Sequence, residues 1–213
     1  SKYWLWVNGR MVIFEGGLKR GPDPRDTYYD EVDRAPYLPQ GENAIAVLVW
    51  YFGKDGFSHN SSGKAGMLFS SPAISLFSDR CWRARLDPAY GILPPLPNFR
   101  LPESSILYDG RLDPGDWQGD SLASLHGFGA AQEVGKAGCQ PWNRLVKRPI
   151  PQWKDFGLKD YLTVTTLRGE SADTLACKLP YNTQLTPYLK VSAPAGKTML
   201  LQTDHFHGGG TIN

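Results

Sequence analysis

The stretch Tyr3-Trp4-Leu5-Trp6-Val7-Asn8-Gly9 decides the fold class of this chain. Its first five residues are aromatic or apolar and predict a β-strand. Asn8-Gly9 is a hairpin turn signal, because both residues tolerate the positive φ that a type I′ turn needs. Residues 10–14 are again mostly apolar and predict the returning strand. The N-terminal segment therefore predicts an antiparallel β-hairpin.

Short segments of the same kind continue along the chain, separated by its 23 glycines and 17 prolines. No amphipathic helix longer than one or two turns is evident. The further predicted strands are residues 27–32, 44–51, 65–69, 73–78, 81–86, 105–109, 161–168, 174–178, 187–191 and 198–204. A Pro-Tyr-Leu corner, which marks a strand edge because proline cannot donate a ladder hydrogen bond, occurs at residues 36–38 and again at 187–189. The sequence predicts an all-β chain with two copies of one kind of sandwich.

A proline-rich segment suggests where the two copies divide. Gly91-Ile92-Leu93-Pro94-Pro95-Leu96-Pro97-Asn98 holds three prolines in eight residues, so it should be extended and poor in hydrogen bonds. We expect a first sandwich over residues 1–90, a linker over 91–104 and a second sandwich over 105–213. The second is short of strands, so we expect it to be truncated here and completed by chain beyond Asn213.

Composition limits the classes of partner. Hydrophobic residues make up 41% of the chain, enough for a core, and the net charge is only +2. The one dense basic spot, residues 144–148, is smaller than a nucleic-acid surface, so we expect no nucleic-acid partner. No apolar run approaches the roughly 20 residues that span a bilayer, so we expect no membrane span. Cys81, Cys139 and Cys177 are interpreted as buried free thiols that could form at most one disulfide.

Motifs in order along nearly the whole chain carry a resemblance to a known family. They are Tyr3-Trp4-Leu5-Trp6-Val7-Asn8-Gly9, Glu15-Gly16-Gly17-Leu18-Lys19-Arg20-Gly21-Pro22, Thr27-Tyr28-Tyr29-Asp30, Pro36-Tyr37-Leu38, Trp50-Tyr51-Phe52-Gly53-Lys54-Asp55-Gly56-Phe57-Ser58, Ser62-Gly63-Lys64-Ala65-Gly66, Tyr108-Asp109-Gly110-Arg111, Pro141-Trp142-Asn143-Arg144-Leu145, Arg148-Pro149-Ile150-Pro151 and Tyr181-Asn182-Thr183-Gln184-Leu185. With these motifs the chain resembles the N-terminal region of bacterial α-L-rhamnosidases. The pieces at 108–111 and 148–151 are fairly specific, whereas the Val-Asn-Gly and Pro-Tyr-Leu pieces are shared with other galactose-binding-like jelly rolls.

The resemblance implies two tandem jelly-roll β-sandwiches that precede an (α/α)6 barrel. In that family the barrel carries the two carboxylates of an inverting glycoside hydrolase. No segment of this chain corresponds to the barrel, so no catalytic residue is carried over and the chain itself is expected not to be an enzyme. The implied partners are the barrel of the same parent chain and rhamnose-containing glycans, and the implied location of the parent is periplasmic or secreted. Two alternatives stay open: an autonomous carbohydrate-binding module, and a structural docking domain without a ligand.

The predicted carbohydrate site lies where a strand enters a glycine-rich loop. Sugar sites combine aromatic faces with hydroxyl, amide or carboxylate groups. The candidate residues are Trp50, Tyr51, Phe52, Ser58, His59 and Asn60. The alternative is that Trp50 and Phe52 belong to the core and the loop is only solvated, since aromatic residues on strands are usually buried.

Acidic and histidine clusters are the remaining candidates. Calcium in the loop of Asp109, Asp113, Asp116 and Asp120 competes with ordinary turn chemistry. The stretch Asp204-His205-Phe206-His207 supplies one pair of metal ligands at best. We therefore expect no metal site and no cofactor. A further acidic group, Glu15, Asp30, Glu31 and Asp33, is interpreted as solvated carboxylates rather than an acid and base pair.

Overall fold

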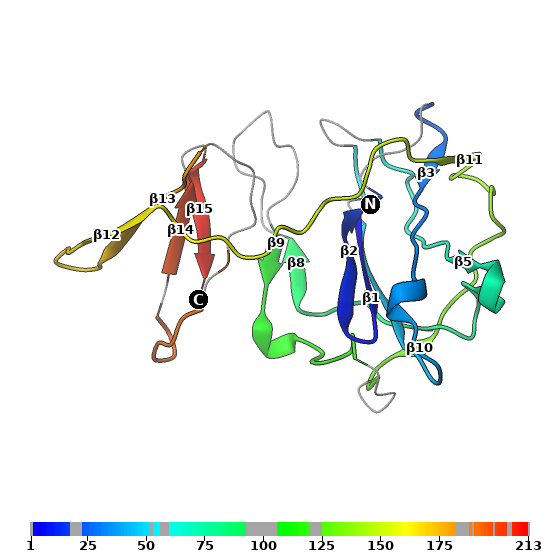
Figure 1. Ribbon diagram of the computed structural model, residues 1–213, viewed down its shortest axis with the longest axis horizontal. Coiled ribbons are helices and arrows are strands. Elements are labelled where there is room, and N and C mark those ends of the chain that lie inside the picture. Colours follow the sequence, from blue (N-terminus) through cyan, green and yellow to red (C-terminus); the bar gives the residue numbers. More distant parts are fainter. Residues whose placement is uncertain are drawn as a thin grey trace. The chain divides into compact units, whose positions relative to one another are not determined.

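A computed structural model describes residues 2–17, 23–51, 53–55, 60–92, 106–119, 125–181, 188, 190–197, 199–203 and 206–212 (Figure 1). The described residues form several small sheets and three short 3-10 turns, with no α-helix among them. The all-β prediction is therefore confirmed at the level of secondary structure. The chain divides into two compact units, Ser1–Trp153 and Lys154–Asn213. The linker predicted at 91–104 falls mostly outside the described residues, and the division of the chain at that segment stays a prediction.

A three-stranded antiparallel sheet forms the centre of the first unit. Strands β1 (Lys2–Val7), β2 (Arg10–Gly16) and β4 (Ile45–Trp50) lie in the order β2-β1-β4. The turn between β1 and β2 has φ of 51° at Asn8 and 74° at Gly9, the positive values that a type I′ turn requires. The predicted hairpin is confirmed. The Asn8 side chain also accepts from the Ala44 amide and donates to the Tyr37 carbonyl, which places the chain that enters β4 beside the turn.

Alternation along β1 gives this sheet two different faces. Leu5 and Val7 are buried, as is Ile13 of β2, and they form the core face. Because side chains of a strand point to opposite faces in turn, Trp4 and Trp6 lie on the other face. Both tryptophans are half-buried, and we call the side of the sheet that bears them the outer face.

A parallel strand pair connects distant parts of the sequence. Strand β3 (Thr27–Tyr29) pairs with β11 (Leu145–Lys147), and Thr27 Oγ1 also donates to the Trp142 carbonyl at 2.8 Å. Ion pairs lie at both ends of the pairing: Arg144 with Asp26, Lys147 with Glu31, and Arg148 with Asp30. The basic spot of the sequence is therefore matched by acidic residues that flank β3.

Asp30 and Arg148 form the buried centre of this arrangement. Asp30 directly follows β3 and Arg148 directly follows β11, so the paired strands bring the two residues together. Arg148 Nε donates to Asp30 Oδ1 at 2.5 Å, and both side chains are only 4% exposed. Tyr3 of β1 donates its hydroxyl to Asp30 Oδ2 at 2.7 Å. Its ring lies against Gly16, where a Cβ would approach the ring to 2.3 Å, so only glycine fits opposite Tyr3. The interpretation of Asp30 as a solvated carboxylate is wrong, because sequence does not show that Arg148 meets it.

Small two-stranded sheets complete the first unit. They are β5 (Ser70–Ser71) with β6 (Leu76–Phe77), β7 (Arg83–Ala84) with β10 (Gly129–Ala130), and β8 (Tyr90–Ile92) with β9 (Ile106–Tyr108). The 3-10 turns are η1 (Ala35–Tyr37), η2 (Pro72–Ile74) and η3 (Gly110–Leu112). The strand predicted over 65–69 is wrong, since pairing begins only at Ser70. The first Pro-Tyr-Leu corner forms η1, and two residues of the second corner, 187 and 189, lie outside the described residues.

The described strands of the second unit form two antiparallel pairs. Strand β12 (Thr163–Leu167) pairs with β13 (Thr174–Lys178), and β14 (Met199–Thr203) pairs with β15 (Phe206–Ile212). Every residue of β12 and β13 is exposed, including Leu175 at 63%. None of the described residues in the strand predicted at 187–191 is in a strand. The described side chains of this unit thus include none that is buried.

The three cysteines are free, and two of them contradict the expectation of burial. Cys81 and Cys177 are exposed and Cys139 is half-buried. Cys177 lies on β13, all of whose residues are exposed.

We predict that Asp30→Asn lowers the free energy of unfolding by about 3–5 kcal/mol, because it leaves the buried Arg148 guanidinium without its counter-charge. Nη2 of Arg148 already makes no hydrogen bond with the described residues, so little remains to compensate. Urea denaturation followed by tryptophan fluorescence measures the change.

Glu31, the residue after Asp30, supplies the matched control. Glu31 pairs with Lys147 at the same strand ends, but these side chains are 57% and 61% exposed. Glu31→Gln should leave the urea midpoint within error of the wild type, because exposed ion pairs contribute little. Equal midpoints for the two variants would contradict the central role of the Asp30–Arg148 pair.

Candidate functional site

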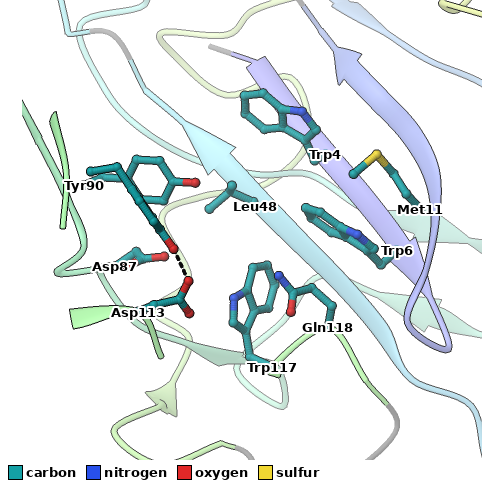
Figure 2. Close-up of a pocket in the computed structure, with 10 residues that line it drawn as sticks. Trp4, Trp6, Met11, Leu48, Asp87, Tyr90, Asp113, Trp117 and Gln118 are labelled. Carbon is teal, nitrogen blue, oxygen red and sulfur yellow. Dashed lines mark hydrogen bonds between the residues drawn. The ribbon is translucent and has the colours of Figure 1, made fainter. Parts of the chain in front are cut away.

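A pocket of about 290 Å³ opens on the outer face of the central sheet. Trp4 and Trp6 of β1, Met11 of β2 and Leu48 of β4 form one side of it. Figure 2 shows Tyr90, Asp87 and Asp113 across from these residues, with Trp117 and Gln118 beside them. All of these residues belong to the first unit. The sheet therefore supplies an apolar floor, and the chain around β8 and β9 supplies the polar groups.

Aromatic rings dominate the lining. The Trp6 and Trp117 rings meet edge to face, with centroids 5.4 Å apart and an interplanar angle of 72°. Tyr90 and Tyr108 are cross-strand partners on β8 and β9, and their ring centroids are 4.9 Å apart. Such edge-to-face pairs are favourable, and they hold large ring faces in fixed orientations. The pocket thus combines five rings from three separate segments: those of Trp4, Trp6, Tyr90, Tyr108 and Trp117.

The loop that carries Trp117 is held close to the β1–β2 turn. A Cβ on Gly9 would lie 3.7 Å from Gly119 Cα and 3.9 Å from the Gln118 carbonyl oxygen, so the two backbones are near contact. The Trp117 amide donates to the Gly115 carbonyl at 2.9 Å. The tight hairpin turn therefore also helps to place Trp117 beside Trp6.

Two carboxylates at the pocket are oriented by backbone amides. Asp87 Oδ1 accepts from the Ala89 amide at 3.0 Å, and Asp113 Oδ1 accepts from the Gly115 amide at 2.7 Å. Asp113 Oδ2 accepts the hydroxyl proton of Tyr108. That hydrogen bond, with the Gly115 amide, lowers the pKa of Asp113, and it raises the pKa of Tyr108 to about 12. Asp113 is therefore a carboxylate at neutral pH and Tyr108 a phenol.

Tyr90 also keeps its proton. Burial, followed by the nearby charges of Asp87 and Asp113, raises its pKa. Its neutral hydroxyl and the Gln118 amide give the pocket both donors and acceptors. The arrangement can hold a small ligand that has a ring-sized apolar face and several polar substituents.

The carbohydrate site predicted from sequence is only partly described. Trp50 ends β4 on the outer face, where Lys2 Nζ lies 5.3 Å from the centre of its ring. Tyr51 Oη is 3.4 Å from Ser61 Oγ, and Asn60 is exposed in the following loop. Phe52, Ser58 and His59 lie outside the described residues. These residues do not line the pocket of Figure 2 as the structure describes it, and their role in sugar binding stays a prediction.

The other candidates have structural partners. Asp109 accepts from the Arg111 side chain at 2.6 Å and 2.8 Å, which lowers its pKa to about 2. Glu15 pairs with Lys2, and Asp33 accepts from the Ala35 amide. Asp120, Asp204 and His205 lie outside the described residues. Within the described part of the chain, no group of three or more His, Cys, Asp or Glu side chains is placed to hold a metal ion.

Comparison of the chain with protein-family models, with curated proteins and with solved structures found no match. Among the described residues, no helix has both the length and the apolar character that crossing a membrane demands.

The sequence contained a signal for this pocket that the prediction of the site did not use. Trp4 and Trp6 alternate with Leu5 and Val7, so two tryptophans had to share the face opposite the buried pair. Two large rings on the open face of a sheet are a sign of a binding surface. The contribution of Trp117 had no comparable signal, because it depends on a contact between distant loops.

We predict that Asp113→Asn lowers the pKa of Tyr108 from about 12 toward the ordinary tyrosine value. In the wild type, the hydrogen bond to Asp113 stabilises the neutral phenol, and the charge of Asp113 disfavours the phenolate. The substitution removes that charge and weakens the hydrogen bond, so the phenolate forms more easily. NMR titration of the Tyr108 ring measures the shift. Asp116→Asn, three residues further along the same loop, is the control and should leave this pKa unchanged. A high Tyr108 pKa that survives Asp113→Asn would contradict the assigned hydrogen bond.

Proposed function

We propose that this chain is a carbohydrate-binding, non-catalytic region of a glycoside hydrolase similar to the α-L-rhamnosidases. The pocket on the outer face is the observation that carries the binding part of this proposal. The sequence motifs that resemble the family support the identity of the parent enzyme. The catalytic barrel would belong to the same parent chain.

The chemistry of the pocket suits a sugar ring. A pyranose presents an apolar face of C–H groups that packs on an indole, and hydroxyls around its edge that need partners. Trp6 and Trp117 offer ring faces, while Asp87 and Gln118 offer an acceptor and an amide at the rim. A volume of about 290 Å³ is at the small end for ligand sites, which favours one sugar residue over a long stretch of polymer.

Asp113 is suited to binding more than to serving as a catalytic acid. An inverting glycosidase needs one carboxylic acid that holds a proton at working pH and one carboxylate that activates water. Both oxygens of Asp113 accept hydrogen bonds, and its pKa is lowered, so it holds no proton to donate at neutral pH. This supports placing catalysis outside the chain.

We further infer that the chain contributes to two galactose-binding-like jelly rolls, the second incomplete. The two-faced sheet of β2, β1 and β4 is the kind of layer from which a sandwich is built. The exposed β12–β13 hairpin supports incompleteness, because an isolated two-stranded hairpin is marginally stable in water. The same exposed hairpin favours a second role, docking onto the barrel of the parent chain.

Titration with L-rhamnose and with neutral oligosaccharides should show binding at millimolar concentration or tighter, and Trp117→Ala should weaken it at least about tenfold. Trp117 is on a loop, so its removal spares the central sheet. Calorimetry measures affinity, and thermal unfolding confirms that the variant folds. Trp153→Ala, which removes an exposed tryptophan outside the pocket, is the matched control and should bind like the wild type.

No binding by the wild type would leave only the docking role. Equal affinity of the wild type and Trp117→Ala would place any sugar site elsewhere, as at Trp50. The same preparations should release no product from a chromogenic α-L-rhamnoside. Release would contradict the claim that catalysis lies outside this chain.

A further inference from the structure

The charged residues that line the pocket in the described part of the chain are both acidic. Asp87 and Asp113 line it, and no lysine or arginine is among the described residues that do. The cations that the neighbouring strands carry face other groups: Lys2 pairs with Glu15 at 3.2 Å, and Arg10 lies 4.9 Å from the Tyr37 ring. The described lining of the pocket is therefore electronegative.

One carboxylate oxygen of the lining has no hydrogen-bond donor within the described part of the chain. Both oxygens of Asp113 are used, by the Gly115 amide and by the Tyr108 hydroxyl. Asp87 uses Oδ1 for the Ala89 amide, and no hydrogen bond from the described residues reaches its Oδ2. Asp87 Oδ2 is thus an anionic acceptor at the mouth of the pocket.

The aromatic walls, like Asp87, favour a positively charged ligand group. Indole and phenol rings carry negative electrostatic potential on their faces, and they attract ammonium groups within about 6 Å. A neutral sugar gains nothing from this field beyond packing and ordinary hydrogen bonds. A sugar carboxylate would be repelled by Asp87 and Asp113 and would find no cation on the described lining.

We propose that the pocket selects an amino sugar, a glycan unit that carries a protonated amine, over its neutral and acidic counterparts. The ammonium group would donate to Asp87 Oδ2 while the ring packs against the Trp6 and Trp117 pair. This proposal rests on the proposed carbohydrate-binding function and names the substituent that the site distinguishes.

Glucose, glucosamine and glucuronate test the proposal, because they share one ring and differ by one substituent. At about pH 6 an amine of this kind is protonated, as α-amino groups are. The wild type should bind glucosamine about three- to tenfold more tightly than glucose, and glucuronate more weakly than glucose. Indole N–H shifts of the tryptophans, followed by NMR during titration, report each affinity.

Asp87→Asn keeps an oxygen that can accept from Ala89 but removes the charge. It should bring the affinities for glucosamine and glucose to within about twofold of each other, because an amide at this position has no charge with which to favour an ammonium group. Asp79→Asn is the matched control, because Asp79 Oδ1 accepts from the Cys81 amide in the same kind of turn and lies outside the pocket. It should keep the wild-type preference.

The outcomes separate the two proposals. Binding of glucose and glucosamine with equal affinity would overturn the preference for an amine and leave carbohydrate binding intact. A preference that survives Asp87→Asn would overturn the role of Asp87. Failure of the wild type to bind glucose, glucosamine, rhamnose or neutral oligosaccharides would overturn both proposals together.

Discussion

The buried ion pair between Asp30 and Arg148 is the interaction on which the first unit depends. It joins residues 118 positions apart at the ends of two parallel strands, and Tyr3 adds the central sheet to it through Asp30. Burying two charges costs desolvation free energy, and only close contact between the two side chains offsets this cost. The geometry fixes which face of the sheet turns toward β3 and β11. The opposite face, with Trp4 and Trp6, is thereby left as the floor of the pocket.

The pocket depends on the different roles of the two faces of the sheet. The buried side chains of the sheet lie on its core face, which Tyr3 links to the ion pair. The outer face therefore does not have to provide buried side chains. Loops then add what a sheet cannot: Asp87 and Asp113 are turned by short backbone hydrogen bonds, and Trp117 is placed by the near contact of its loop with Gly9. Small-molecule sites are commonly built in this way, with functional residues on loops that a rigid scaffold positions.

Local features of this fold could be predicted from sequence and non-local ones could not. The Asn8-Gly9 turn and its two strands were predicted because turn chemistry acts over adjacent residues. The pairing of β3 with β11 was not, since nothing within either segment identifies a partner so far along the chain. The same limit explains the site: the aromatic residues at Trp50 form a cluster in the sequence itself, whereas Trp6 and Trp117 become neighbours only through folding.

The most direct test of the central claim is to observe which rings a bound sugar touches. Intermolecular nuclear Overhauser effects between the C–H protons of a bound neutral oligosaccharide and the assigned indole protons provide this information. The account predicts contacts to Trp6 and Trp117, on the outer face of the sheet. Contacts confined to Trp50, or to tryptophans outside the first unit's pocket such as Trp142, would contradict it.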